Sequence, residues 1–159
     1  MADKRNTVTK TTSSKILNSF KCTFSAKSIN EGFARTIVSV FVSQLDPTVS
    51  ELSDLKTAVS EAVTNSIVHA YKDNRENAMI YLSASYKSDN TVTVEIKDKG
   101  CGIPDVAKAR EPLYTSVGGE RSGLGFSVME SFSDKLRVRS RVGVGTTITF
   151  DKIIKGKAR

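Results

Sequence analysis

The chain has 159 residues, 38% of them hydrophobic and 26% charged, with a formal net charge of +7. This length suits one globular domain with its own hydrophobic core. No apolar run approaches the length of about 18 residues that spans a membrane, and the first residues lack the apolar segment of a secretory signal. Cys22 and Cys101 are too few for a disulfide framework or a metal set, so we expect a cytoplasmic protein.

The positive charge is concentrated at the two ends of the chain. Residues 1–30 carry six Lys and Arg against one Asp, and residues 151–159 carry four against one. Residues 31–150 are nearly neutral, with 14 basic and 15 acidic side chains. Basic tails of this kind are more often solubilising segments than specific binding arms. Nucleic-acid binding stays open as an alternative to a solvated face, because four basic residues alternate along one predicted strand. These are Lys135, Arg137, Arg139 and Arg141.

The first half of the chain predicts a tail, a strand and two helices. Residues 1–14 are rich in Thr, Ser and Lys and are expected to be a disordered basic tail. Residues 16–25 alternate apolar and polar side chains, which predicts a strand. A helix should follow, opened by Ser28 and Glu31 as a capping box and ended before Pro47. Its expected core-facing residues are Phe33, Ile37, Val40, Phe41 and Leu45.

A second helix is predicted from about Ser50 to Ala70, because apolar residues recur along it at helical spacing. Residues 78–87 and 92–97 alternate in the same way as the first strand, on either side of a short polar turn. They predict an antiparallel hairpin. The segment 98–122 is rich in Gly and Pro, and a loop of this length inside a domain is usually functional.

A helix over residues 123–133 and two strands, at 136–141 and 146–154, complete the predicted domain. The order β-α-α-β-β-loop-α-β-β predicts an α+β fold. We expect a two-layer sandwich in which a mixed, mostly antiparallel sheet carries its helices on one face. The domain should span residues 15–154, with residues 155–159 as a basic C-terminal tail.

Three polar residues of the second helix are spaced four residues apart: Glu61, Asn65 and His69. This spacing places them along one stripe of an α-helix. Asn gains little in the middle of a helix, which indicates that Asn65 has a role beyond structure. A solvated helix face, with His69 as a favourable cation near the helix C-terminus, is the structural alternative.

Asp98 ends the predicted hairpin in the inward phase of its strand. A buried carboxylate needs a partner or a ligand to offset its desolvation. Gly100 and Gly102, just beyond it, would let the backbone pass close to such a ligand. Alternatively, Asp98 caps a tight turn in which the glycines supply positive φ angles.

A glycine-rich segment, residues 118–125, leads into the third predicted helix. The backbone N–H groups and the dipole at a helix start bind phosphate in loops of this kind. The segment lacks the Gly-Lys-Ser/Thr of a Walker A loop and does not directly follow a strand, as a Rossmann fingerprint does. A flexible surface connection is the alternative.

In this order, the features resemble the N, G1, G2 and G3 boxes of the GHKL superfamily of ATP-binding domains. The four are Glu-x-x-x-Asn on a helix, Asp-x-Gly-x-Gly after a strand, Gly-x-Gly at a helix start and a late Gly-Thr-Thr. The similarity covers about residues 16–154. Residues 33–71, with REPLYTS and ERSGLGFSVMESFSD further on, resemble the anti-sigma-factor serine kinases of spore-forming bacteria more narrowly.

The resemblance implies a single domain that binds ATP and Mg²⁺ and forms a homodimer. It implies two protein partners: an RNA polymerase sigma factor that is held inactive, and an anti-anti-sigma factor that is phosphorylated on a serine. It favours the sporulation group, with a sigma factor of the F type, over the stress-response group of the B type. A sigma-factor-binding module that uses nucleotide without kinase turnover stays open. No membrane and no specific nucleic-acid partner is expected.

The resemblance also implies roles for single residues. Asn65 matches the Mg²⁺ ligand, and its neutral amide oxygen suits an ion that keeps several waters. Glu61 matches the catalytic carboxylate, which would accept the proton of a serine hydroxyl. Asp98 matches the carboxylate that reads the amino group of adenine. The other positions matched around the adenine are Gly100, Gly102 and Thr146.

Residues 111–125 match the ATP lid of this superfamily. The lid positions implied in nucleotide binding are Thr115, Ser116, Gly123 and Gly125. Gly123 and Gly125 would open the helix whose N–H groups hold the phosphates. Arg121 would contribute to catalysis by contacting the γ-phosphate, or would contact a protein partner instead.

Overall fold

The computed structural model describes residues 14–71, 76–112 and 124–156. Five strands form one sheet in the order β1-β2-β3-β5-β4, and every neighbouring pair is antiparallel. The strands are β1 (Ile16–Ser25), β2 (Met79–Lys87), β3 (Thr91–Asp98), β4 (Lys135–Arg141) and β5 (Gly145–Ile153). The predicted tail over residues 1–14 lies outside the described residues except for Ser14.

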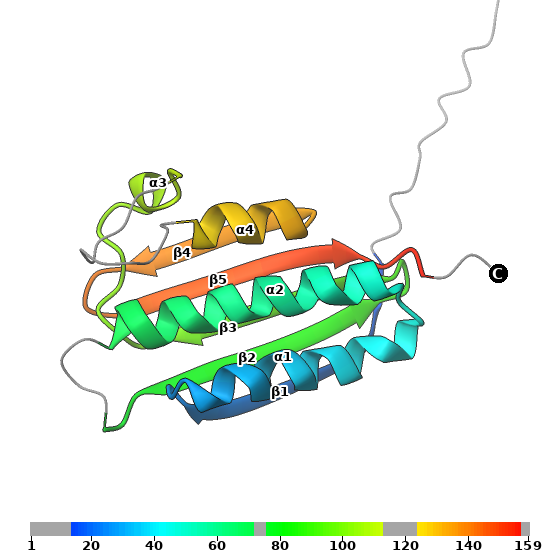
Figure 1. Ribbon diagram of the computed structural model, residues 1–159, viewed down its shortest axis with the longest axis horizontal. Helices are drawn as coiled ribbons and strands as arrows, with labels where there is room; N and C mark the ends of the chain where they lie inside the picture. The colour runs from blue at the N-terminus through cyan, green and yellow to red at the C-terminus, as the bar shows by residue number, and fades with distance from the viewer. Residues whose placement is uncertain (1–13, 72–75, 113–123, 157–159) are drawn as a thin grey trace, which may run out of the picture.

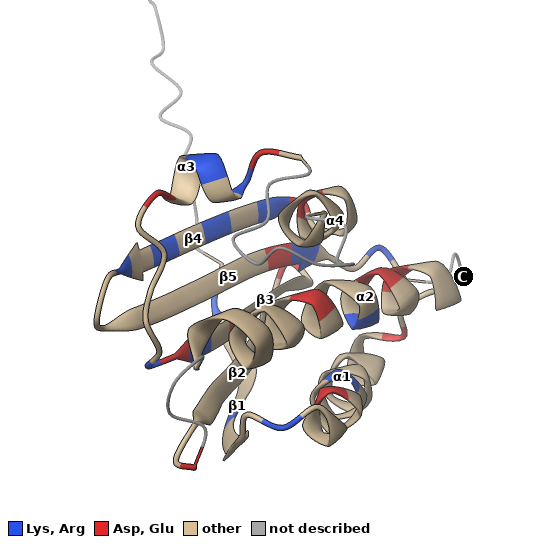
Figure 2. Cartoon of the chain, turned by 60° about the vertical axis from the view of Figure 1, so that its left-hand side comes forward, with Lys and Arg blue, Asp and Glu red and all other residues tan. Residues whose placement is uncertain are grey.

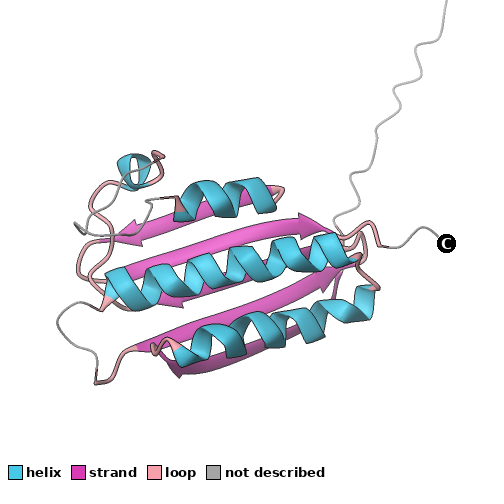
Figure 3. Ribbon diagram, in the orientation of Figure 1, coloured by secondary structure: helices cyan, strands magenta, loops and turns pink. Residues whose placement is uncertain are grey.

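The long helices cover one face of this sheet, as Figures 1 and 3 show. They are α1 (Ile29–Val42), α2 (Val49–Asn65) and α4 (Gly125–Phe132). A short helix, α3 (Val106–Ala109), packs beside β4. The predicted α+β sandwich with its helices on one face is therefore confirmed. No helix in the described part of the chain has the length and apolarity needed to cross a membrane.

The hydrophobic core fills the space between the sheet and the helices, with α2 between α1 and α4 (Figure 1). Alternate residues of the two central strands β2 and β3 point into it and are at most 1% exposed. These are Ile80, Leu82, Val92, Val94 and Ile96. The same alternation carries Asp98, the last residue of β3, onto the buried face, where it is 3% exposed.

The predicted capping box at Ser28 is wrong. Ser28 has a helical backbone conformation, with φ −53° and ψ −35°, and makes no side-chain capping bond. A capping side chain reaches the helix from an extended residue, and that geometry occurs at the start of α2. There Thr48 and Glu51 form a reciprocal capping box, with Thr48 at φ −68° and ψ 160°. Glu31 instead pairs with Arg35 at 2.8 Å.

The predicted apolar stripe of α1 is only partly correct. Phe41 is buried as expected, but Phe33 and Val40 are 48% and 65% exposed. The buried face is instead formed by Ala34, Val38, Ser39, Phe41 and Val42. The reason is that α1 packs against α2 as well as against the sheet, which turns its buried face toward the neighbouring helix.

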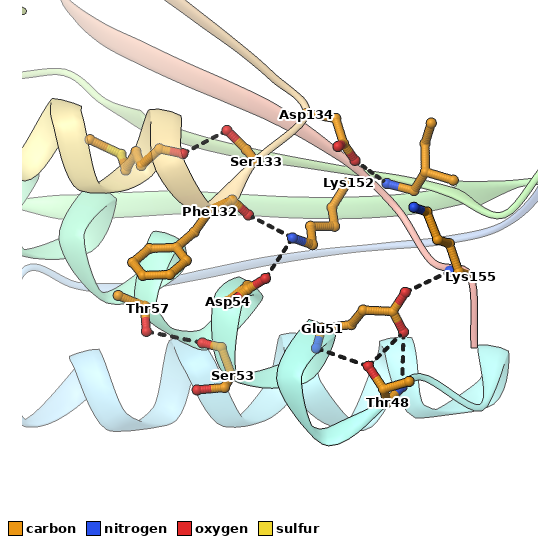
Figure 4. A network of polar contacts seen from close by, with 12 residues as sticks. Thr48, Glu51, Ser53, Asp54, Thr57, Phe132, Ser133, Asp134, Lys152 and Lys155 are labelled. Carbon is orange, nitrogen blue, oxygen red and sulfur yellow. Dashed lines mark hydrogen bonds and ion pairs between the residues drawn. The ribbon is translucent and has the colours of Figure 1, made fainter. Parts of the chain in front are cut away.

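A polar network ties the end of the chain to the start of α2 (Figure 4). The Glu51 carboxylate accepts from the backbone N–H of Thr48 at 2.8 Å and of Lys155 at 2.7 Å. Lys152 Nζ binds Asp54 Oδ2 at 2.7 Å. Hydrogen bonds therefore fix this end of α2 to the rest of the structure. The polar residues predicted to take part in chemistry lie at its other end.

Candidate functional site

Glu61 and Asn65 lie one turn apart at the C-terminal end of α2, and the start of α4 packs against both. A Cβ atom added to Gly125 would lie 3.2 Å from Glu61 Oε2 and 3.2 Å from Asn65 Oδ1. Three of the residues predicted for the site are thus in one place. The first backbone N–H groups of α4 and the positive end of its dipole lie beside these two side chains.

The helix changes its geometry directly after Asn65. Residues Ser66–Ala70 form a π-helical turn, which is wider than an α-helical turn. The α-helical geometry on which the predicted stripe rests therefore ends at Asn65, and His69 lies in the π turn. The backbone carbonyl of His69 accepts from the Cys101 thiol at 3.2 Å. The π turn also brings Ser66, 2% exposed, toward the end of β3.

Asp98 is the centre of a buried hydrogen-bond network. Its Oδ1 accepts from the backbone N–H of Gly100 at 3.0 Å and of Thr146 at 3.1 Å. Its Oδ2 accepts from the Ser66 hydroxyl at 3.1 Å. A carboxylate oxygen can accept two hydrogen bonds. With this one described partner, Oδ2 retains capacity to accept from a ligand.

Burial raises the pKa of the Asp98 carboxyl above its ordinary value. The hydrogen bonds from Gly100, Thr146 and Ser66 act in the opposite direction without cancelling the effect of desolvation. The charged form is therefore less favourable in the protein than in water. A ligand that donates a hydrogen bond to this carboxylate would relieve the imbalance.

Gly100 and Gly102 hold the loop after Asp98 against other backbone segments. A Cβ at Gly100 would lie 2.2 Å from the carbonyl oxygen of Ala70. Gly102 has φ +73°, and a Cβ there would lie 2.2 Å from the carbonyl oxygen of Arg141. The two glycines thus allow the loop to fit between the end of the π turn and the end of β4.

Three residues of this site were missed by sequence reasoning: Ser66, Tyr71 and Ser140. The Tyr71 hydroxyl donates to the carbonyl oxygen of Met79 at 2.6 Å and accepts from the N–H of Lys99 at 2.8 Å. Ser140 accepts from the N–H of Ile103 at 2.7 Å. The contacts of Tyr71 with Lys99 and of Ser140 with Ile103 join segments far apart in the sequence, and no local pattern marks them.

The predicted lid positions are not all described. Gly125 lies at the site, whereas Thr115, Ser116, Arg121 and Gly123 lie outside the described residues. Within the described part of the chain, no group of three or more His, Cys, Asp or Glu is arranged to hold a metal ion. A metal bound here would therefore rely on few protein ligands.

The basic face of β4, which left nucleic-acid binding open, is partly neutralised. Figure 2 shows Lys and Arg along this strand. Arg137 forms a two-point pair with Asp151 of β5, at 2.7 and 3.1 Å. Lys135, Arg139 and Arg141 are exposed.

The comparisons with known proteins agree with this fold. The family model of the histidine kinase-like ATPase domain matches residues 24–152. The RsbU and RsbW domains of a Mycobacterium tuberculosis protein have a similar fold, with a TM-score of 0.67 at 19% identity. The match covers 89% of this chain and 34% of that structure. The class defined by fold and site is thus the histidine kinase-like ATPase domain.

Sequence relatives narrow the class. An anti-sigma F factor of Clostridium beijerinckii is 52% identical over 136 residues, which cover 85% of this chain and 94% of the relative. One of Geobacillus kaustophilus is 48% identical over 143 residues, which cover 89% of this chain and 97% of the relative. The chain belongs to the anti-sigma F factor family.

Proposed function

We propose that the chain is a cytoplasmic anti-sigma factor and an ATP-dependent protein serine kinase. It would bind and inhibit a sporulation sigma factor of the F type and phosphorylate a serine of an anti-anti-sigma factor. The observation that carries the kinase proposal is the contact of Gly125 with both Glu61 and Asn65. It supports the proposal because a carboxylate, an amide oxygen and a helix start together suit the terminal phosphate of ATP.

The proposed reaction is a direct transfer. The serine hydroxyl oxygen attacks the γ-phosphorus, the bond from the γ-phosphorus to the bridging oxygen breaks, and ADP leaves. The Glu61 carboxylate accepts the proton of the serine hydroxyl. The N–H groups at the start of α4 stabilise the negative charge of the phosphoryl group. Most of the catalysis would come from this positioning, since phosphoryl transfer requires little covalent chemistry from the protein.

The residues present fit a Mg²⁺ ion bound mainly by water and phosphate oxygens. Asn65 would supply a neutral oxygen ligand, and no further protein ligand is needed for such an ion. The metal would neutralise charge on the phosphates when bound. Asp98 would accept a hydrogen bond from the exocyclic amino group of adenine through Oδ2. Guanine, which has a carbonyl oxygen at that position, would be disfavoured.

The partner proposal rests on the family and on an exposed apolar surface. The relatives cited above are named anti-sigma F factors. Exposed apolar side chains lie on α1 and at the start of β1, which pack against each other through Phe24 and Phe33. They are Ile16, Leu17, Ile29, Phe33 and Val40. We propose that these side chains contact a homodimer partner or the sigma factor.

The test is incubation of the chain with labelled ATP, Mg²⁺ and a candidate anti-anti-sigma protein, followed by phosphoserine analysis. The proposal predicts label on one serine of the partner. If the chain binds nucleotide and captures the sigma factor but transfers no phosphate, it is a binding module and the kinase proposal is wrong. Parallel reactions with sporulation and stress-response partner pairs decide between the F and B types.

A further inference from the structure

The hydroxyl of Ser140, on β4, joins three segments of the candidate site. Its Oγ lies 2.7 Å from the N–H nitrogen of Ile103, 2.8 Å from Thr146 Oγ1 and 3.2 Å from the carbonyl oxygen of Gly145. Ile103 follows the loop after Asp98, and Thr146 stands near the start of β5. None of the roles assigned above uses Ser140.

The donors and acceptors around Ser140 limit the directions that its hydrogen bonds can take. The backbone N–H of Ile103 can only donate, so Ser140 Oγ accepts there. Either oxygen can be the donor in the 2.8 Å contact between Ser140 Oγ and Thr146 Oγ1, and Ser140 can also donate to the carbonyl oxygen of Gly145 at 3.2 Å. When the proton of Ser140 lies on Thr146 Oγ1, the Thr146 hydroxyl directs its own proton elsewhere, and a ligand acceptor beside Thr146 would select this arrangement.

Thr146 lies directly beside the buried carboxylate. Its backbone N–H donates to Asp98 Oδ1 at 3.1 Å, and the residue is 7% exposed. A nucleotide base that donates its amino group to Asp98 would lie next to Thr146, so a neighbouring ring atom could meet the Thr146 hydroxyl. In adenine the amino group is flanked by N1 and N7, and both ring nitrogens are acceptors. A hydroxyl that meets either nitrogen must be a donor.

We propose that Ser140 is a positioning residue that orients the Thr146 hydroxyl as a hydrogen-bond donor to a ring nitrogen of adenine. The chain of bonds runs from the N–H of Ile103 to Ser140 and from Ser140 to Thr146. Hydrogen bonds linked in this way strengthen one another. The inference rests on the proposed binding of ATP, and its new element is the role of Ser140 behind Thr146, a position already matched to the adenine site.

The experiment measures the Kd of ADP for the wild type, Ser140→Ala, Thr146→Val and the double variant. Losing one hydrogen bond to a neutral acceptor weakens binding about tenfold, and we expect this loss for Ser140→Ala. Because Ser140 acts through Thr146, the double variant should bind no more weakly than Thr146→Val alone. Additive losses would overturn the proposal, because they would mean that the two hydroxyls act separately.

A second measurement uses the wild type and does not depend on how the variants fold. One of the two analogues, 1-deaza-ADP or 7-deaza-ADP, should bind about tenfold more weakly than ADP. That same analogue should then be insensitive to Ser140→Ala. If both analogues bind the wild type as tightly as ADP, no donor contacts the ring and the proposal is wrong.

Two control variants separate positioning from folding. Ser140→Thr retains the hydroxyl and should restore ADP affinity. Ser39→Ala removes a hydroxyl that is also poorly exposed but bonds only to Arg35 O within α1, so it should leave the Kd unchanged. A wild-type chain that binds no adenine nucleotide contradicts the proposed function itself. Normal ADP affinity in a folded Ser140→Ala chain contradicts only the role of Ser140.

Discussion

Ser66 donates a hydrogen bond of 3.1 Å to Asp98, 32 positions later in the chain. This contact connects the helix that carries Glu61 and Asn65 to the end of the strand that carries the buried carboxylate. It exists because a π turn begins at Ser66, immediately after Asn65. The two halves of the candidate site, which we propose to hold the phosphates and the base, are therefore connected by one continuous element.

Asp98→Asn should abolish the recognition of adenine. The variant replaces an acceptor by an amide whose NH₂ group would oppose the amino group of the base, and we expect at least about 100-fold weaker ADP binding. Calorimetric titration with ADP and GDP measures the effect, and the preference for ADP over GDP should decrease. Asp134→Asn is the matched control. Among the described residues, the Asp134 carboxylate accepts from the N–H of Ile153, which lies near the start of α2 and away from the site. Unchanged ADP affinity in Asp98→Asn would show that this carboxylate does not read the base.

The raised pKa of Asp98 predicts how nucleotide binding and stability change with pH. Binding needs the charged carboxylate, so the affinity for ADP should fall as the pH is lowered through the raised pKa of this group. For the unliganded chain the sign is opposite. The folded state holds this proton more tightly than the unfolded state, so the contribution of Asp98 to stability decreases as the pH rises through that range. Unfolding curves of the wild type and Asp98→Asn should therefore diverge in favour of the variant as the pH rises.

Glu61→Gln should bind ATP normally and lose phosphoryl transfer. The substitution retains the shape of the side chain against Gly125 but removes the base, and general-base catalysis contributes about 10²- to 10⁴-fold. Quench-flow measurement of phosphoserine, together with the Kd of ATP, separates the two effects. A normal transfer rate would mean that Glu61 is not the base.

Asn65→Ala should make nucleotide binding insensitive to Mg²⁺. The variant loses the one neutral oxygen that we assign to the metal, so the gain in ATP affinity on adding Mg²⁺ should disappear. Titrations with and without the metal measure that gain. Thr64→Ala, one residue earlier on α2, provides a neighbouring control. A Mg²⁺ effect of wild-type size in Asn65→Ala would remove this residue from the metal site.

Gly125→Ala tests the contact between α4 and the end of α2. The new methyl group would lie 3.2 Å from both Glu61 Oε2 and Asn65 Oδ1, which is closer than ordinary packing. We expect the transfer rate to fall by about tenfold or more, because small displacements of catalytic groups have large effects. Adenine binding at Asp98 should change less. Transfer at the wild-type rate would show that the start of α4 has no role in placing Glu61.

Glu51→Gln should destabilise the fold without affecting the site. Burial acts to raise the pKa of Glu51, but hydrogen bonds from Thr48, Lys155 and Gly156 outweigh it and lower the pKa. Gln can still accept through its one carbonyl oxygen, but its NH₂ group cannot accept the hydrogen bonds made to the other carboxylate oxygen, so the free energy of unfolding should fall by about 1 kcal/mol. A depressed carboxyl pKa stabilises the fold above its unfolded-state value, and this stabilisation is lost as the pH falls through the folded-state value. The difference from the wild type should close in acid, and ADP affinity at neutral pH should not change.

The sequence predicts the structure correctly where the repeating pattern of side chains within one helix or strand determines it. The alternation of β3 predicts that Asp98 points inward, and helical spacing predicts that Glu61 and Asn65 share a stripe; both are found. The sequence does not predict the π turn that begins at Ser66 and contains His69, because a π turn has no signature in a pattern of period 3.6. The capping box was placed at Ser28 because Ser28 and Glu31 fit its pattern. Thr48 and Glu51 fit it equally, and only the backbone conformation distinguishes the two.

The parts of the site that the sequence did not predict depend on contacts between distant segments. Ser140 meets Ile103 across 37 positions, and Tyr71 meets Lys99 across 28. The order of the sheet accounts for the first of these contacts, since β5 and β4 follow β3 across it. The residue types at these positions do not predict the contacts, because a hydroxyl on a strand is usually solvated.

The most direct test of the central claim is a crystal structure of the chain with ADP and Mg²⁺. The account predicts the exocyclic amino group of adenine within hydrogen-bond distance of Asp98 Oδ2, and the metal bound to Asn65 Oδ1 beside the start of α4. A nucleotide bound elsewhere on the chain, or adenine turned away from Asp98, would contradict it.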